Sequence, residues 1–126
     1  MTKADISTIE HIKLLVDSFY TKVREDQLLA NVFNKVIQDR WPKHLETMYR
    51  FWETILLGNH NYYGSPFTPH ASLNLTKEHF SQWISLFHQT IDEHFCGEKA
   101  NEAKWRAERM AEMFLYKIAD YQNNPS

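Results

Sequence analysis

The chain has few of the residues that interrupt or crosslink a fold: one cysteine, three glycines and four prolines among 126 residues. The single cysteine, Cys96, excludes an intramolecular disulfide and any CxxC or CxxCH motif, and we expect it to pack as a small hydrophobic side chain. With so few glycines there are no hairpin turn signals, and no useful length of the chain alternates with period two. These absences argue against a β-sheet protein.

The chain also lacks a charge excess and a long apolar run. Fourteen Lys and Arg against 16 Asp and Glu leave a formal charge of −2, so we expect neither nucleic acid nor a membrane as a partner. No run approaches the roughly 20 apolar residues of a membrane span. The first residues, MTKADISTIE, have no apolar core typical of a secretory signal. We therefore expect a cytoplasmic protein.

What the sequence does contain is 43% hydrophobic residues, arranged in stripes with helical spacing. Helices are predicted from a cap at Ser7 to about Val23, briefly within EDQLLANVF, from RWPKH to Gly58, from a cap at Thr76 to about Phe95, and over about 98–121. The length suits one domain spanning 1–126, with a core over 6–120 and a tail over 121–126. The expected fold class is all-α.

One segment departs from this pattern. GSPFTPH, residues 64–70, contains two of the prolines and ends on His70. Each proline lacks a backbone donor and biases the preceding residue away from helix. Regular helix is therefore not expected over 64–68.

The spacing of the seven histidines indicates which kinds of metal site the chain could form. They stand at positions 11, 44, 60, 70, 79, 88 and 94, so no two lie three or four residues apart, and neither HExxH nor ExxH occurs. Haem, by contrast, supplies four nitrogens of its own and needs one axial histidine in an apolar pocket. His70 is the candidate, with Pro66 and Pro69 restricting its approach. We interpret the histidines at 11, 60, 79, 88 and 94 as solvated or incidental.

At this point the sequence resembles a known family. FYTKVREDQLLANVF, WPKHLETMYRFWETILLG, GSPFTPH and HFSQWISLFHQTI are similar, in this order, to segments of the third group of truncated haemoglobins, and the likeness spans about residues 6–120. It implies a shortened globin fold, a two-over-two helical sandwich whose proximal helix is largely replaced by loop. It also implies a non-covalent haem b, iron protoporphyrin IX, as cofactor.

The resemblance implies roles for individual residues. His70 matches the proximal iron ligand, and Tyr20 matches the tyrosine on the opposite face of the iron. His44 matches the histidine of the distal helix, and Trp83 matches a tryptophan that reaches into the same pocket. Each of these positions, taken without the family, is also compatible with an ordinary core or surface residue.

The resemblance further assigns contacts with the porphyrin. Phe33 matches a phenylalanine packed on the porphyrin edge, and Met48 matches an apolar position of the distal wall. Arg50, Lys43 and Arg40 are candidates to pair with the propionates, and the sequence does not choose among them.

The expected function is reversible binding of dioxygen and other diatomic ligands, with NO, CO and cyanide as further ligands or probes. Tyr20, Trp83 and His44 are potential hydrogen-bond donors to such a ligand, which favours slow release and hence redox chemistry over delivery. An alternative is a haem enzyme, a nitric oxide dioxygenase or peroxidase served by a separate reductase. A further alternative is a haem-free helical interaction module.

Overall fold

The computed structural model describes the backbone of residues 3–58 and 75–123, and the side chains of these ranges except 36 and 118–123. The helices are α1 (Ile9–Glu25), α2 (Leu29–Ile37), α3 (Trp41–Leu57), α4 (Lys77–His94) and α5 (Glu98–Asn123). Within the described ranges there is no strand, and a single isolated β-bridge joins Ala4 to Phe95. The all-α prediction is confirmed, and α5 continues to Asn123, slightly beyond its predicted end.

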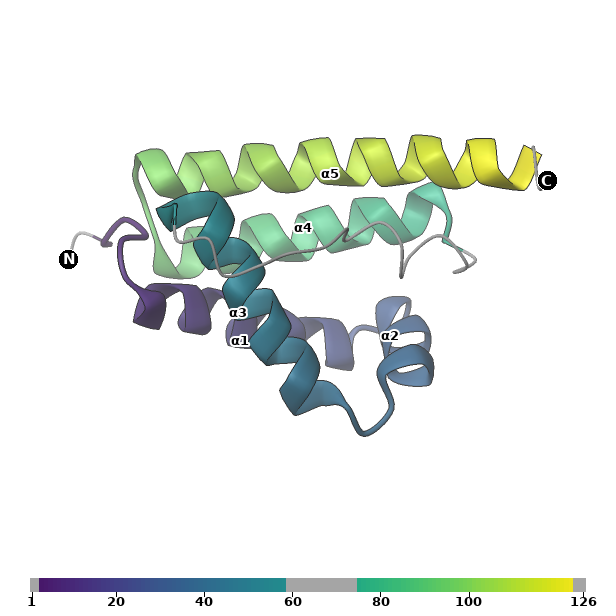
Figure 1. Cartoon of the computed structure of the whole chain (residues 1–126), viewed down its shortest axis with the longest axis horizontal. Helices are drawn as coiled ribbons and strands as arrows, with labels where there is room; N and C mark the ends of the chain where they lie inside the picture. The colour runs from purple at the N-terminus through teal and green to yellow at the C-terminus, as the bar shows by residue number, and fades with distance from the viewer. Residues whose placement is uncertain (1–2, 59–74, 124–126) are drawn as a thin grey trace.

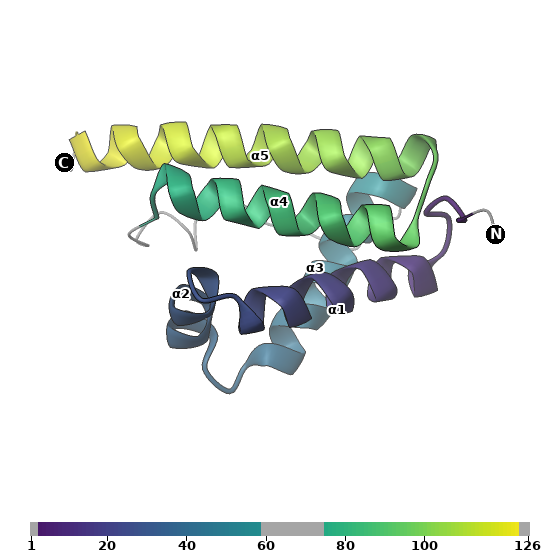
Figure 2. The same cartoon turned by 180° about the vertical axis from the view of Figure 1, so that it is seen from behind.

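The helices form two layers. α4 and α5 lie side by side and run in opposite directions, while α3 crosses α1 on the other side of the molecule (Figures 1 and 2). α1 also packs against α4, and α3 contacts α5, so the two pairs enclose a common core. The short α2 follows α1 and contacts α4. This is the two-over-two arrangement of a shortened globin; the loop predicted in place of the proximal helix lies outside the described residues.

The ends of the helices follow from local hydrogen bonding. Thr8, and not Ser7 as predicted, caps α1, because the Thr8 hydroxyl accepts the His11 N–H at 3.2 Å while Ser7 donates its own N–H to the His11 ring at 3.0 Å. Thr76 caps α4 as predicted and shares a reciprocal capping box with His79. At the end of α3, Gly58 takes a left-handed conformation with φ of +76°.

The core is built from the inner stripes of the helices. α1 buries one continuous stripe against the other helices: Ile12, Leu15, Val16, Phe19, Tyr20 and Val23. α5 instead presents small residues to the core: Ala100, Ala103, Ala107 and Ala111. Because alanine projects little beyond the backbone, α5 can approach α4 closely and leave room for the large rings of the other helices.

The segment before α1 is fastened to the start of α5 by Asp5. One carboxylate oxygen accepts the Ala100 N–H at 2.8 Å and the other accepts the Lys99 N–H at 2.9 Å, so Asp5 satisfies two free donors of the α5 N-terminus. Partial burial raises the pKa of Asp5, but these backbone donors, with the Ile6 N–H and the Lys99 ammonium, outweigh it and hold that pKa below 3.8. Gly97 permits this approach because it has no side chain. A Cβ atom added at Gly97, whose φ is +135°, would lie 2.6 Å from the Asp5 Cγ.

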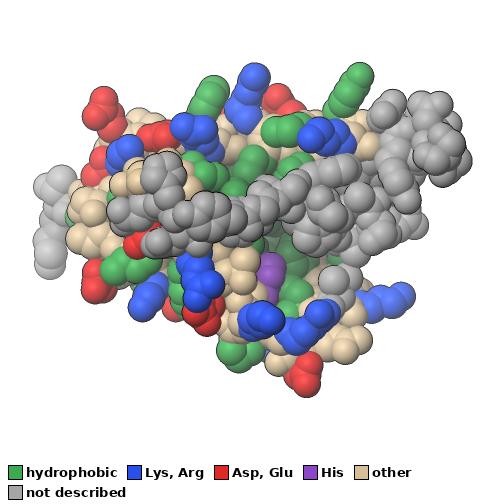
Figure 3. Space-filling view, in the orientation of Figure 1, with side chains coloured by type: hydrophobic (Ala, Val, Ile, Leu, Met, Phe, Trp, Pro, Cys, Tyr) green, Lys and Arg blue, Asp and Glu red, His purple; other side chains and the backbone are tan. Residues whose placement is uncertain are grey.

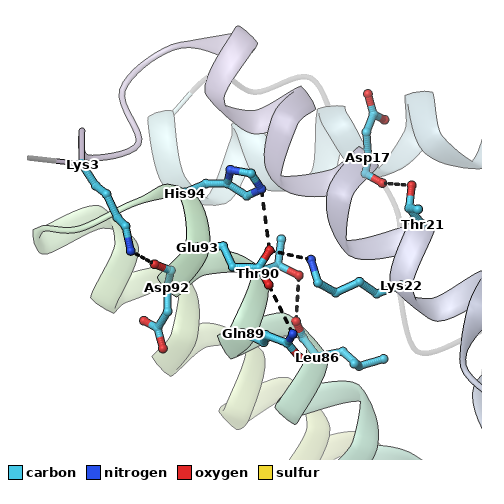
Figure 4. Close-up of polar contacts among 10 residues, drawn as sticks. All are labelled: Lys3, Asp17, Thr21, Lys22, Leu86, Gln89, Thr90, Asp92, Glu93 and His94. Atoms are coloured by element: carbon cyan, nitrogen blue, oxygen red, sulfur yellow. Dashed lines mark hydrogen bonds and ion pairs between the residues drawn. The ribbon is translucent and has the colours of Figure 1, made fainter. Parts of the chain in front are cut away.

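An ion pair also joins the two layers near the end of α4. The Lys22 ammonium of α1 lies 3.0 Å from a Glu93 carboxylate oxygen of α4, and Gln89 donates to the other oxygen of that carboxylate at 3.2 Å (Figure 4). On the same helix Thr90 is fully buried, and its hydroxyl donates to the Leu86 carbonyl oxygen at 2.8 Å. A buried hydroxyl satisfied within its own helix leaves the surrounding core apolar.

Cys96 corrects one expectation. Its side chain is exposed and does not pack in the core. The residue follows the last turn of α4, and its N–H donates to the Ala4 carbonyl oxygen at 3.0 Å, so the backbone contact decides its position. In the part of the chain that the structure describes, no helix has the length and apolar character needed to cross a membrane.

Candidate ligand pocket

A cavity of about 190 Å³ lies between the two layers, and all the helices contribute to its wall. Most of its lining is apolar, with a few polar-tipped side chains. The described lining residues are Tyr20, Leu29, Phe33, His44, Thr47, Met48, Phe51, Trp52, Leu75, His79, Phe80, Trp83, Met110, Ala111 and Phe114. An apolar cavity with few convergent polar groups is the usual form of a small-molecule site.

The residues singled out from the sequence meet at this cavity. Tyr20 of α1, Phe33 of α2, His44 and Met48 of α3, and Trp83 of α4 all line it. His44 and Met48 stand one helical turn apart, so they share a face of α3. Residues from four helices thus converge on one space.

Tyr20 is a neutral hydrogen-bond donor inside the cavity wall. Its side chain is buried, and burial raises the pKa of the phenol far above its usual value. Its ring meets the ring of Phe33 at a centroid distance of 6.1 Å and that of Trp41 at 5.8 Å, both edge to face. Among the described residues its hydroxyl has no hydrogen-bond partner. Because burial raises its pKa, the phenol keeps its proton and its capacity to donate a hydrogen bond.

Trp83 presents a second donor from a rigid position. Its ring is stacked on Phe87 at 5.6 Å with planes 5° apart, and it meets Phe19 edge to face at 5.4 Å. Two aromatic neighbours in fixed geometry restrict the rotation of the indole. Its N–H has no hydrogen-bond acceptor within the ranges that the structure describes.

His44 lies in the first turns of α3, which begins at Trp41. Pro42 fits this first turn because the N–H group that proline lacks would have no partner within the helix. The His44 N–H donates to the Arg40 carbonyl oxygen at 2.9 Å, and the ring lies edge to face against Trp41 at 5.7 Å. Its Nε2 atom is buried. The imidazole therefore belongs to the cavity wall and not to the outer surface of the helix.

Asp26 holds the helices that carry these side chains in place. It follows α1, and its carboxylate accepts the N–H groups of Leu28 and Leu29 at 3.0 and 2.9 Å at the start of α2. The same carboxylate accepts from the Gln82 amide of α4 at 2.6 Å. Since Gln82 precedes Trp83, one side chain ties α1, α2 and α4 together beside the cavity.

Several lining residues were not identified from the sequence. His79, interpreted there as incidental, lines the cavity, and its Nδ1 accepts the Thr76 N–H at 3.0 Å in the capping box. Its spacing from Trp83, one turn along α4, was an available signal. Met110 and Phe114 of α5 also line the cavity.

The predicted contacts with haem propionates remain predictions. Arg50 is exposed and pairs with Glu46 along α3, and Lys43 is also exposed. The Arg40 Nε donates to the Ile37 carbonyl oxygen at 3.2 Å in the turn before α3. These three residues are absent from the described lining of the cavity. His70, the predicted iron ligand, lies outside the described residues.

The described residues offer no alternative metal centre, because nowhere among them do three or more His, Cys, Asp or Glu side chains gather to hold an ion.

Comparisons with known proteins agree on one family. The sequence matches the family model described as bacterial-like globin over residues 5–116. It is 34% identical over 119 residues to the group 3 truncated hemoglobin ctb of Campylobacter jejuni subsp. jejuni, an alignment that covers 89% of this chain and 94% of that protein. The crystal structure of a group III truncated hemoglobin from Campylobacter jejuni matches with a TM-score of 0.85 and 30% identity, covering 93% of this chain and 95% of the other.

Proposed function

Because this chain belongs to the bacterial-like globin family, we propose that it binds haem b without a covalent link and holds dioxygen and other diatomic ligands reversibly beside it. The observation that carries the proposal is Tyr20, a buried side chain that lines an otherwise apolar cavity and whose hydroxyl has no hydrogen-bond partner among the described residues. A buried polar group costs free energy unless it is hydrogen-bonded, so such a donor calls for an acceptor supplied by a ligand.

The side chains present fit a porphyrin. Phe33 is the proposed contact with the porphyrin edge, and Met48 is the proposed apolar residue of the distal wall of the pocket. Phe80 and Phe114 extend the apolar surface of the same cavity. His70 is the proposed axial ligand, supported by its match to the proximal histidine of the truncated haemoglobins. When bound, haem supplies an iron that coordinates diatomic ligands and exchanges electrons.

The chain's own contribution is to hold donors in place and to exclude water. Tyr20 keeps its proton because burial raises its pKa, and it can donate to the polar end of a ligand. Trp83 and His44 line the same cavity and supply two further donors. Each hydrogen bond contributes on the order of 1 kcal/mol, and more where water is excluded.

Several converging donors favour slow ligand release, which suits redox chemistry better than oxygen delivery. The second candidate function is therefore a haem enzyme, a nitric oxide dioxygenase or peroxidase that receives electrons from a separate reductase. The same three donors support it, because they stabilise negative charge that develops on a reacting ligand. A cytoplasmic location is part of this proposal.

The test begins with an absorption spectrum of the purified chain titrated with haem. We expect one equivalent of haem to bind with a histidine-ligated spectrum. Denaturation should release this haem unmodified, and the reduced protein should bind dioxygen reversibly. A chain that binds no haem would instead be a helical interaction module. Steady turnover of nitric oxide or peroxide with an added reductant would distinguish the enzyme from the reversible binder.

A further inference from the structure

The outward face of α5 carries a regular row of exposed side chains. Trp105, Arg109, Glu112 and Tyr116 follow one another four, three and four residues apart, so they stand in one line along the helix. Trp105 is 54% exposed and Tyr116 is 76% exposed. In Figure 3 hydrophobic, basic and acidic side chains project side by side from the edge of the molecule along which α5 runs in Figure 1. We call these four residues the α5 outer row.

Neither aromatic ring of the α5 outer row packs into the core that the described residues form. The opposite face of α5 fills the core with alanines and supplies Met110 and Phe114 to the cavity wall. The Trp105 ring touches only side chains of its own helix among the described aromatic contacts, namely the guanidinium groups of Arg106 and Arg109 at 5.6 and 5.7 Å from its centroid. Exposed apolar surface rimmed by charge is typical of an interaction site.

Within the described ranges, the two charges at the centre of the row are not neutralised by an opposite charge, although the Arg109 guanidinium lies over the Trp105 ring. Among the described residues, neither the Arg109 guanidinium nor the Glu112 carboxylate takes part in an ion pair. Other charged side chains of α5 are paired: Arg106 with Glu102 at 3.3 Å, and Lys104 with Asp92. The outer row therefore presents one free cation and one free anion, flanked by an aromatic ring at either end.

This order of residues is complementary to itself. A two-fold axis perpendicular to α5, between residues 110 and 111, sets Arg109 against the partner's Glu112, and Glu112 against the partner's Arg109. The same axis sets Trp105 against the partner's Tyr116 and Tyr116 against the partner's Trp105. We propose that a second copy of this chain docks antiparallel along the α5 outer row. A two-fold contact must match a surface with itself, and this row does so in its charges and in the positions of its aromatic residues.

The arrangement also excludes the parallel alternative. Parallel helices in register would bring Arg109 against the partner's Arg109 and Glu112 against the partner's Glu112, which repels at both positions. From Trp105 to Tyr116 the row spans roughly 16 Å at 1.5 Å per residue, so the contact is short and association depends on concentration. Docking of the second copy leaves the cavity wall untouched, because the α5 residues that line the cavity lie on the opposite face of the helix.

Sedimentation equilibrium of the full-length, haem-loaded protein over a wide concentration range tests the proposal. The wild type should pass from monomer to dimer as its concentration rises. Arg109→Glu and Glu112→Arg each create two like-charge contacts across the axis and should weaken the dimer by about tenfold or more, a change of roughly 1.4 kcal/mol. Lys35→Glu, an exposed charge reversal on α2, changes the net charge as much as Arg109→Glu does and should leave the dimer unaffected.

Two further experiments, which restore opposite charges across the axis, make the test specific. The double variant Arg109→Glu, Glu112→Arg restores opposite charges across the axis and should dimerise like the wild type. An equimolar mixture of the two single variants should also associate, since each supplies the charges that the other needs. A wild type that stays monomeric at every concentration overturns the proposal. So does a dimer that the single reversals do not weaken, or a double variant that fails to recover.

Discussion

The ring of Tyr20 meets the ring of His44 edge to face, with centroids 5.1 Å apart and planes at 84°. The two side chains come from α1 and α3, which cross in one layer, so the crossing of these helices brings two polar-tipped rings to the same wall of the cavity. Their mutual contact means that a change in one ring removes part of the packing that orients the other. Tyr20 and His44 are therefore expected to act as a pair.

The donors around the cavity predict the rate of ligand release. In the haem-loaded protein, Tyr20→Phe and Trp83→Phe should each speed dioxygen dissociation roughly five- to tenfold, because each removes a hydrogen bond worth about 1 kcal/mol. Stopped-flow displacement of dioxygen measures the rates. The double variant need not equal the sum of the single variants, because one donor can move closer when the other is lost.

Carbon monoxide serves as the control for this prediction. It carries less negative charge than dioxygen when bound, so its dissociation should change far less in the same variants. Unchanged dioxygen dissociation in both single variants and in the double would disprove the role of these donors, while the haem-binding proposal would stand.

His44 is expected to control ligand entry. Because its imidazole lines the cavity early in α3 beside Trp41, His44→Leu should alter the association rate of carbon monoxide more than the equilibrium affinity for dioxygen. Flash photolysis measures the first quantity and oxygen titration the second. A large loss of affinity at constant association rate would instead identify His44 as a direct donor.

His70 is predicted to supply the only protein bond to the iron. His70→Ala should lose most haem on gel filtration, and added imidazole should restore part of it by filling the space that the side chain leaves. His60→Ala is the matched control, since it removes a histidine to which no role is assigned. Wild-type haem content and a histidine-ligated spectrum in His70→Ala would show that another residue is the ligand.

Asp5 predicts a dependence of stability on pH. Asp5→Ala should lower the free energy of unfolding by about 1 kcal/mol at neutral pH, the usual cost of losing a carboxylate at a helix N-terminus. Because the pKa of Asp5 is lowered in the folded state, its ionised form contributes above 3.8, and the contribution is lost as the pH falls through the folded value. The difference between wild type and variant in urea unfolding should therefore shrink at acidic pH. A difference that stays constant down to that range would mean that the charge of Asp5 plays no part.

The two described glycines with positive φ predict unequal costs of substitution. Gly97→Ala should destabilise by roughly 2 kcal/mol or more, since its φ is +135° and the new methyl group would meet the Asp5 carboxyl. Gly58→Ala should cost about 1 kcal/mol, because its φ of +76° is strained for alanine but the space around it is open. Urea unfolding of both variants in parallel provides the comparison, and equal losses would contradict the steric argument.

Much of the fold could be predicted from the sequence because each helix carries a long, regular apolar stripe. Gly58 marked the end of α3 through its left-handed backbone conformation, and Thr76 marked the start of α4 through its capping hydroxyl. The start of α1 was harder, since Ser7 and Thr8 have equivalent hydroxyl groups and only the position of the His11 ring separates them. Cys96 was misjudged because its environment is decided by a backbone contact with Ala4, distant in sequence.

The candidate site divides in the same way. Tyr20, His44 and Trp83 were singled out through the family resemblance, since each position taken alone is also compatible with an ordinary core or surface residue. Phe114 was not identified, because its place at the cavity depends on how α5 crosses the other helices. Crossing geometry comes from packing between elements, and no pattern within one helix reports it.

The fastening of Asp5 to the start of α5 has a consequence for the order of folding during synthesis. The hydrogen bonds from Lys99 and Ala100 to Asp5 close sequence separations of 94 and 95 residues. While the ribosome is still making α4, the acceptor at the beginning of the chain has no donors to meet, and closing so long a loop is slow and entropically costly. The contact between the segment before α1 and the start of α5 can therefore form only after Lys99 and Ala100 have left the exit tunnel.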